Sequence, residues 1–297
     1  MELRVLNYFL TVAREENITK AANLLHMTQP TLSRQIRGLE EELNVKLLER
    51  HSHYVRLTED GLMLRRYAQD LLELAEKTKQ EFVGSRTLAG KISIGCGDTQ
   101  NMEVLAAWMA EFHRQYPLIT FQVQSKTADV VQEQIENGLL DIGLLMEPVD
   151  VMKYEVLRMP LLESWGILVQ ESSLLAEKEN IHPDDLLEVP LILPERILVQ
   201  SHLKRWFGGT YEKLHQVATY NLLLNTIYMV RSGLGTAICY DFHQQMTPGL
   251  RFIPLKGIGA VGAVLAWKKQ QALSKAARIF LGYCHTHQDD PQQTSER

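Results

Sequence analysis

The chain has 297 residues, of which 45% are hydrophobic, and a formal net charge of −5 at pH 7. This length suggests about two or three domains, and this composition is ample for sizeable hydrophobic cores. No run of 18 or more apolar residues occurs and the Met-Glu-Leu-Arg start lacks the layout of a secretory signal. A transmembrane helix is therefore not predicted, and we expect a cytoplasmic protein.

Residues 2–15 are predicted to form an amphipathic helix that supports the elements after it. Residues 18–43 are predicted to form two further helices, joined by a tight turn at His26-Met27. Thr19 is expected to cap the first of these two helices and Thr28 the second, because a threonine hydroxyl can accept from the free amides of a first turn. Pro30 fits the first turn of the second helix, where no intrahelical hydrogen bond is lost.

The second of these helices has one apolar and one polar face. The apolar side chains recur at spacings of 4, 3 and 4 and are Leu32, Ile36, Leu39 and Leu43. The polar face can donate to phosphates and reach base edges in a DNA major groove, although a helical hairpin with a solvated face is the simpler alternative. The predicted DNA contacts on this helix are Thr28, Gln29, Pro30, Thr31, Ser33, Arg34 and Arg37.

Two short strands are predicted next, at 46–50 and 54–57, and they would form a small β-wing. Arg50 and Arg56 lie on or beside this wing and could contact backbone phosphate or the minor groove; the alternative is a hairpin with solvated charges. Residues 1–58 contain 8 Lys/Arg and 7 Asp/Glu. With so little excess charge, DNA binding would require cations grouped on one face, and it would depend strongly on salt.

The segment resembles the DNA-binding domain of LysR-type transcriptional regulators. An alanine pair, Ser/Thr-Gln-Pro/Ser, Ser-Arg/Lys-Gln-Ile and Leu-Glu typify that domain. These motifs occur here as Ala21-Ala22, Thr28-Gln29-Pro30, Ser33-Arg34-Gln35-Ile36 and Leu39-Glu40. The resemblance implies a winged helix-turn-helix domain over residues 1–58. The chain departs from the family where Leu48 replaces the usual Phe and His53 stands where a second arginine is frequent.

A long helix is predicted from Glu59 to about Arg86, within a linker of residues 59–89. Its apolar seam predicts a coiled-coil dimer, although a helix packed on its own domain remains the alternative. The resemblance implies a homodimer with two recognition helices, and it leaves dimer or homotetramer open. The seam residues are Leu64, Ala68, Leu71, Ala75, Thr78 and Phe82.

Short β-branched strands alternate with helices from residue 90 onward, which predicts an α/β domain over 90–297. The first five of these elements, between 91 and 146, have the β-α-β-α-β order of a parallel sheet. Further strands and helices follow to a last helix at about 273–285, and the polar tail is expected to be disordered. This layout resembles the two-lobed effector domain of LysR-type regulators, which is built like a type-2 periplasmic binding protein. The implied lobe I spans about 90–160 and 267–288, and lobe II about 161–266.

Ligands of open α/β sheets bind beyond the carboxyl ends of the strands. That rule and the resemblance point to loops between the lobes as the effector site, with helix capping as an equally good alternative for each residue. Acidic side chains there would disfavour an anionic effector and Lys126 would favour one, so the charge of the effector stays open. The candidate effector-binding residues are Asp98, Thr99, Gln100, Ser125, Thr127, Glu147, Gln200 and Ser201.

Other chemistry is not indicated by the sequence. P-loop, His-Glu-x-x-His, Gly-x-Ser-x-Gly and Cys-x-x-Cys motifs are absent. His285 and His287 would point to different sides of a helix, so we expect neither a metal nor a cofactor. Three widely spaced cysteines (Cys96, Cys239 and Cys284) fit a reducing compartment and are expected to be buried, with a thiol switch as the alternative.

Two functions follow from this organisation. The prediction is a ligand-responsive, sequence-specific DNA-binding transcriptional regulator without enzymatic activity, whose partners are promoter DNA and a small-molecule effector. The alternative is a small-molecule binding protein or enzyme on a two-lobed α/β fold. That alternative explains residues 90–288 equally well but gives residues 1–86 no role.

Overall fold

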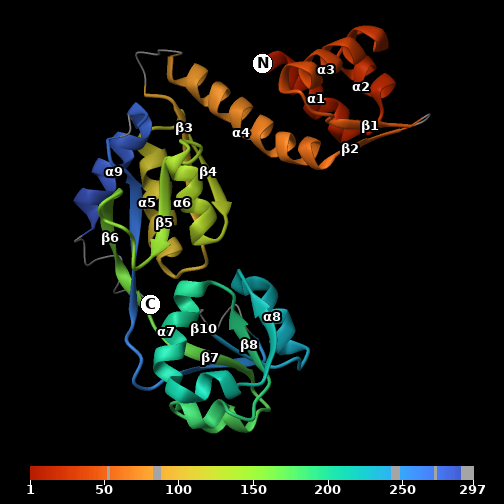
Figure 1. Cartoon of the computed structure of the whole chain (residues 1–297). Helices are drawn as coiled ribbons and strands as arrows, with labels where there is room; N and C mark the ends of the chain where they lie inside the picture. The colour runs from red at the N-terminus through yellow and green to blue at the C-terminus, as the bar shows by residue number, and fades with distance from the viewer. Residues whose placement is uncertain (52–53, 83–87, 242–247, 271–272, 289–297) are drawn as a thin grey trace. The chain divides into compact units, whose positions relative to one another are not determined.

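The computed structural model describes residues 1–51, 54–82, 88–241, 248–270 and 273–288. These residues form two compact units, Met1–Gly84 and Ser85–Arg297 (Figure 1). His53, the expected end of the long helix near Arg86 and the polar tail from 289 onward lie outside the described residues. Among the described helices, none combines the length and apolarity that a membrane crossing requires.

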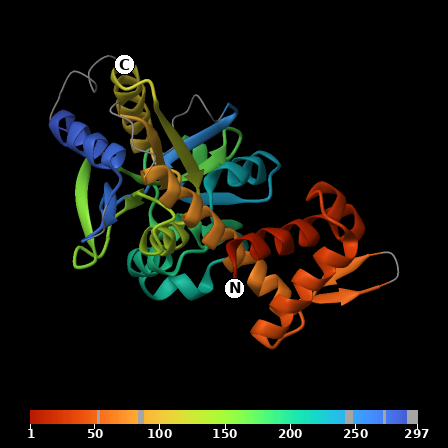
Figure 2. The same ribbon diagram turned by 90° about the horizontal axis from the view of Figure 1, so that it is seen from above.

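The first unit is a winged helix-turn-helix, as predicted. Its core consists of the inner faces of three helices, closed by a short antiparallel hairpin in which Glu49 pairs with Arg56. Figure 2 shows this hairpin extending from the helical body. The elements are α1 (Leu3–Glu15), α2 (Ile18–Leu24), α3 (Gln29–Leu43), β1 (Leu48–Arg50), β2 (Val55–Leu57) and α4 (Glu59–Phe82).

The helix ends differ in detail from the expectation. Asn17, not Thr19, caps α2: the helix begins one residue earlier, and the Asn17 side chain accepts from the backbone N–H of Lys20 at 2.9 Å. Thr28 occupies the N-cap position of α3, but its hydroxyl lies 2.8 Å from the hydroxyl of Thr31 rather than accepting from the backbone. Asn44 ends α3 in the left-handed conformation at φ 54°.

A buried carboxylate fixes α3 to the wing. Glu40 lies on the inner side of α3 and is only 4% exposed. Its Oε1 accepts from the backbone N–H groups of Leu47 and Leu48 at 2.9 and 3.3 Å, and its Oε2 accepts from the Arg50 guanidinium at 3.3 Å. The Glu40 carboxylate thus provides an acceptor for the backbone N–H groups at the start of β1. The same contacts fix the orientation of α3.

The apolar residues of α4 fall on two faces rather than one seam. Ala68 is buried in the core of the first unit, and Leu64 and Leu72 pack beside it. This face therefore packs on its own domain, which was the alternative to the predicted coiled coil. A second set of apolar side chains at spacings of 4, 4 and 3 is exposed within the unit, and it consists of Met63, Tyr67, Leu71 and Leu74.

The second unit has two lobes, and each lobe has a five-stranded sheet with helices on both faces. The lobe I sheet has the order β4-β3-β5-β12-β6, in which β3 runs parallel to β4 and β5 as predicted. Helices α5 and α9 cover one face, where Trp108 and Phe280 are buried, and α6 covers the other. The elements are β3 (Gly90–Cys96), α5 (Asn101–Gln115), β4 (Ile119–Ser125), α6 (Ala128–Glu136), β5 (Ile142–Met146), β6 (Tyr154–Glu163), β12 (Val261–Lys268) and α9 (Lys275–His287).

The lobe II sheet has the order β11-β7-β10-β8-β9. Helix α7 packs on one face and α8 on the other. The elements are β7 (Trp165–Gln170), β8 (Leu191–Pro194), α7 (Ile197–Phe207), β9 (Gln216–Tyr220), α8 (Leu223–Arg231), β10 (Thr236–Tyr240) and β11 (Leu250–Pro254), with short 3-10 helices at Leu174–Glu177, Pro183–Leu186 and Gly208–Lys213.

The lobe boundaries need a small correction. Strand β12 pairs with β5 and β6, so it belongs to the lobe I sheet, although residues 261–266 were assigned to lobe II. Strand β6 likewise continues in that sheet to Glu163, beyond the expected limit of 160. Ser164 alone separates β6 from β7, so the chain crosses between the lobes at this residue.

Glu40→Ala should destabilise α3 and the wing. The substitution leaves two buried backbone N–H groups and the Arg50 guanidinium without their acceptor, which costs roughly 3 kcal/mol. We expect amide hydrogen exchange in peptides covering α3 and β1 to accelerate about a hundredfold. Glu41→Ala, on the exposed side of the same helix, is the matched control. Equal protection in both variants would show that the Glu40 contacts contribute little.

Candidate nucleic-acid interface and effector cleft

The N-terminal half of α3 presents the polar face expected from the sequence. Thr28, Gln29, Pro30, Thr31, Arg34 and Arg37 are all exposed. The buried side of the same helix, including Leu32, packs in the domain core. The exposed guanidiniums and hydroxyls are therefore held on a rigid element and can meet phosphates and base edges without rearrangement of the fold.

Two of the predicted DNA-binding residues contact each other. The Arg50 guanidinium donates to the Ser33 hydroxyl at 3.0 Å and also contacts Glu40, and its side chain is only 33% exposed. Arg50 thus connects the wing to α3 from within. Arg56, in contrast, is exposed on β2, where its guanidinium lies 5.3 Å from the centre of the Tyr54 ring. Arg56 is thus free of ion pairs with the described residues, and Arg50 and Ser33 contact each other at the exposed junction of the wing and α3, where their DNA contacts stay predictions.

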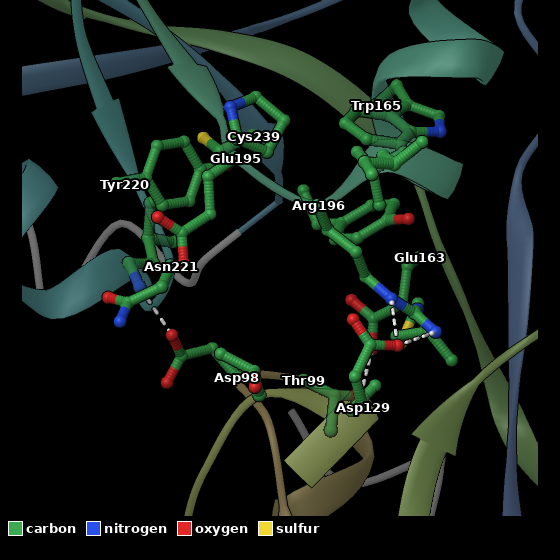
Figure 3. A pocket seen from close by; sticks show the side chains of 18 of the residues that line it. Asp98, Thr99, Asp129, Glu163, Trp165, Glu195, Arg196, Tyr220, Asn221 and Cys239 are labelled. Carbon is green, nitrogen blue, oxygen red and sulfur yellow. Dashed lines mark hydrogen bonds and ion pairs between the residues drawn. The ribbon is translucent and has the colours of Figure 1, made fainter.

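A cavity of about 450 Å³ lies between the two lobes (Figure 3). The wall from lobe I comes from the loop after β3 and the start of α6. The wall from lobe II comes from the ends of β8, β9 and β10 and the start of α7. These positions follow the rule that ligands bind beyond the carboxyl ends of the strands. Of the predicted effector residues, the wall includes Asp98, Thr99 and Thr127.

The remaining predicted effector residues do not line this cavity. The side chain of Ser201 donates to the Ile197 carbonyl within α7, and that of Gln200 donates to the Pro194 carbonyl. Glu147 contacts Arg158, and Ser125 is exposed at the end of β4. Gln100 bridges the lobes instead, because its side-chain amide donates to the Asp241 carbonyl at 2.9 Å.

Asp98 caps a helix, but the helix belongs to the other lobe. Its carboxylate, in the loop after β3, accepts from the backbone N–H of Leu223 at the start of α8. A carboxylate at a helix N-terminus is favoured by the free amides and the helix dipole. This contact and the Gln100 bridge both join lobe I to lobe II.

Glu163 occupies the crossing point and is completely buried. Its Oε1 accepts from the Thr99 hydroxyl, from the Gln100 backbone N–H at 2.9 Å and from the Asn101 side-chain amide at 3.3 Å. Its Oε2 has no partner among the described residues. Burial raises the pKa of Glu163, although these three donors partly counteract the effect. Burial also raises the pKa of Asp98.

Several wall residues were not predicted from the sequence. Trp165 and Tyr240 pack together with ring centres 4.1 Å apart, and Arg196 pairs with Asp129 across the lobes at 3.2 Å. Tyr220 also lines the wall, and its hydroxyl donates to the Ile238 carbonyl at 2.8 Å. The sequence gave no sign that Trp165 and Arg196, 31 positions apart in the chain, line one cavity.

The three cysteines are buried, as predicted. Cys96, Cys239 and Cys284 are free and buried, and burial raises the pKa of all three thiols. The thiol form, which reacts slowly, is thereby favoured. Among the residues that the structure describes, no three His, Cys, Asp or Glu side chains lie close enough to hold a metal ion.

Glu163→Gln should change how stability depends on pH. Because burial raises the pKa of Glu163 in the folded state, its contribution to the free energy of unfolding is fully present below its ordinary pKa of 4.5 and is lost as pH rises through the folded value. We expect the wild type to lose stability relative to the variant in this window, by at most about 1.4 kcal/mol per pH unit. Urea unfolding from pH 4 to 8 measures this difference.

Glu147→Gln is the control for this measurement, because Glu147 is a half-exposed carboxylate away from the cavity wall. If the difference in unfolding free energy between the wild type and Glu163→Gln did not change with pH, Glu163 would not be destabilised by its burial.

Two family models match the chain. The LysR substrate binding domain matches residues 85–289, and the bacterial regulatory helix-turn-helix protein, lysR family, matches residues 3–62. The Hca operon transcriptional activator HcaR of Escherichia coli (strain K12) is 30% identical over 291 residues, which cover 95% of this chain and 96% of that protein. The HTH-type transcriptional regulator YtlI of Bacillus subtilis (strain 168) is 27% identical over 262 residues, 86% of this chain and 83% of that protein.

Solved structures show the same fold. CbnR, a LysR family transcriptional regulator, superposes with a TM-score of 0.75 at 21% identity, covering 98% of this chain and 100% of that one. Full-length CbnR in complex with its target DNA gives a TM-score of 0.74 at 22% identity, covering 95% and 98%. The chain belongs to the LysR family and is a ligand-responsive, DNA-binding transcriptional regulator.

Proposed function

We propose that this regulator recognises its operator with the exposed N-terminal half of α3, and that a small molecule in the interlobe cleft controls the binding. The observation that carries the proposal is the exposed set of hydroxyl, amide and guanidinium groups on α3, with the opposite side of the helix buried. Arg34 and Arg37 form no ion pair with any described residue, so both guanidiniums are available for bases or phosphates.

Arg56 has a different role in this proposal. It lies on the wing, and its stacking beside Tyr54 restricts the guanidinium without neutralising it. A cation in this position suits a backbone phosphate and would add affinity that does not depend on sequence. Arg50 would act indirectly, by holding the wing against α3 through Ser33 and Glu40.

The proposal includes a homodimer formed through α4. The exposed side chains of Met63, Tyr67, Leu71 and Leu74 form an apolar stripe along one side of this helix. A second copy of α4 would cover the stripe, and two subunits related by a two-fold axis would place two α3 helices on a nearly symmetric operator. Two such dimers could then associate into a homotetramer.

The effector would act by shifting a population of lobe arrangements. Three contacts join the lobes around the cavity: Asp98 with Leu223, Gln100 with Asp241, and Arg196 with Asp129. A ligand that touches both walls favours the arrangement in which these contacts are made. Because linkage is reciprocal, a ligand that changes operator affinity must itself bind with a different affinity when DNA is present.

The proposal assigns no catalytic activity and no cofactor to the chain, and it places the protein in the cytoplasm with its DNA. The relatives described above are named as transcriptional regulators. The alternative of an enzyme or carrier on a two-lobed fold is not favoured, because it leaves the winged helix-turn-helix without a role.

Arg34→Ala and Arg56→Ala should have different effects on DNA binding. If Arg34 makes a paired contact with a base, its loss should cost about 1–3 kcal/mol on the operator and relax sequence preference at that position. Loss of Arg56 should weaken all sequences alike and reduce the salt dependence. Gel-shift and footprinting assays on DNA upstream of the protein's own gene, against a scrambled sequence, measure both effects.

Arg4→Ala is the control, since Arg4 is an exposed cation paired with Glu2 on α1. Sequence-specific binding by the wild type that neither Arg34→Ala nor Arg37→Ala alters would refute the role given to α3. A changed sequence preference in Arg56→Ala would refute the phosphate assignment.

Leu71→Glu should separate the subunits. The substitution places a charge in the middle of the proposed apolar stripe, and two such charges would face each other across a dimer axis. We expect a shift toward monomer in analytical ultracentrifugation and a loss of operator affinity. Glu73→Gln, on the polar side of α4, should leave the association unchanged. A wild type that is monomeric at micromolar concentration would contradict the dimer.

A further inference from the structure

The wall of the interlobe cavity is strongly acidic. Arg196 is the one basic side chain among the described residues that line it, and its guanidinium already contacts Asp129. Lys126, which could have favoured an anion, does not line the cavity and donates to the Gln134 side chain at 2.7 Å. The carboxylates on the wall are those of Asp98, Asp129, Glu163, Glu195 and Asp241.

One of these carboxylates lacks a donor. Glu163 is fully buried, its Oε1 accepts three hydrogen bonds, and its Oε2 accepts none from the described residues. A buried carboxylate oxygen without a donor costs free energy, so a ligand that supplies an N–H group would recover it. The Trp165 ring lines the cavity as an apolar surface.

The remainder of the wall suits an apolar body. Trp165 and Tyr220 lie on different sides of the cavity (Figure 3). Tyr240 packs against Trp165, and Leu223 also lines the wall. Aromatic rings contribute dispersion and, toward a cation, attraction to their faces. A volume of about 450 Å³ lies within the range of roughly 300–1,000 Å³ typical of small-molecule sites.

Two other ligand classes fit less well. An organic acid would add negative charge beside carboxylates that are already destabilised, since burial raises the pKa of both Asp98 and Glu163. A metal ion needs several converging ligands, and the described acidic side chains are spread around the wall rather than gathered in a cluster.

We infer that this cleft binds an organic cation, a primary or secondary amine attached to an aromatic body, with the ammonium group at Glu163 and the body against Trp165, Tyr220 and Tyr240. The inference rests on the proposed function only in taking the cavity as the effector site. The Asp98 carboxylate lies elsewhere on the cavity wall and would attract the cation at longer range. An anionic isostere would leave Glu163 Oε2 without a donor, and a neutral alcohol would supply a donor without the positive charge.

Three isosteric probes test the charge preference on the full-length protein. Tryptamine, tryptophol and indole-3-acetate share one ring and differ at neutral pH in carrying a positive, zero or negative charge. Isothermal titration with each should show that tryptamine binds about tenfold or more tightly than either of the others. Failure of tryptamine to bind at millimolar concentration, or equal or tighter binding of indole-3-acetate, would overturn the inference.

Variants of two cavity carboxylates test whether the preference for a cation arises in the cleft. Glu163→Gln and Asp98→Asn should each reduce tryptamine affinity about tenfold and change tryptophol affinity little. Glu147→Gln removes a carboxylate outside the cavity and should leave all three affinities unchanged. Thermal unfolding confirms that each variant is folded, and Asp98→Asn carries the test if Glu163→Gln is not. Retention of the full preference in both folded variants would contradict the inference.

Gel shifts on the operator distinguish the inference from the function on which it rests. Operator affinity that responds to tryptamine supports both. Tight tryptamine binding without any change in operator affinity supports the cation site and contradicts its role as the effector site. An operator response to indole-3-acetate, without one to tryptamine, supports the effector cleft and overturns the preference for a cation.

Discussion

The fixed orientation of α3 depends on one buried carboxylate. Glu40 accepts from two backbone N–H groups at the start of the wing and from Arg50, so the helix and the hairpin form one rigid piece. Because the carboxylate faces inward, the groups on the opposite side of α3 remain exposed for another molecule. Arg50 then connects to Ser33, which continues the same network to the first turns of the helix. DNA recognition in this account requires no change within the domain.

The effector domain also uses buried or partly buried carboxylates as hydrogen-bond acceptors. Here the donors lie at the N-termini of helices. Asp98 of lobe I caps α8 of lobe II, and Glu163 accepts from residues at the start of α5. Glu163 is fully buried and Asp98 partly buried, and burial raises the pKa of both. Asp98 joins the lobes and Glu163 lacks a donor to Oε2, so the charge of a ligand in the cavity is linked to the arrangement of the lobes.

The sequence predicted the winged helix-turn-helix and the parallel core of lobe I because both depend on local patterns. Alternating apolar residues, caps and turns are read over a few positions. The sequence did not predict the features that depend on contacts between residues far apart in the chain. Strand β12 belongs to lobe I because it pairs with β5 and β6, which precede it by about a hundred residues. Periodicity likewise could not separate the buried face of α4 at Ala68 from the exposed one at Leu71.

The residues that line the cleft likewise include some that the sequence predicted and some that it missed. Asp98, Thr99 and Thr127 follow strand ends, and a rule about strand ends found them. Trp165 and Arg196 were missed because their place on the wall depends on the packing of one lobe against the other.

The most direct test of the account is to select bound fragments from sheared genomic DNA with the purified protein. We predict enrichment of an inverted repeat with half-sites about one helical turn apart; fragments with no shared sequence would contradict it.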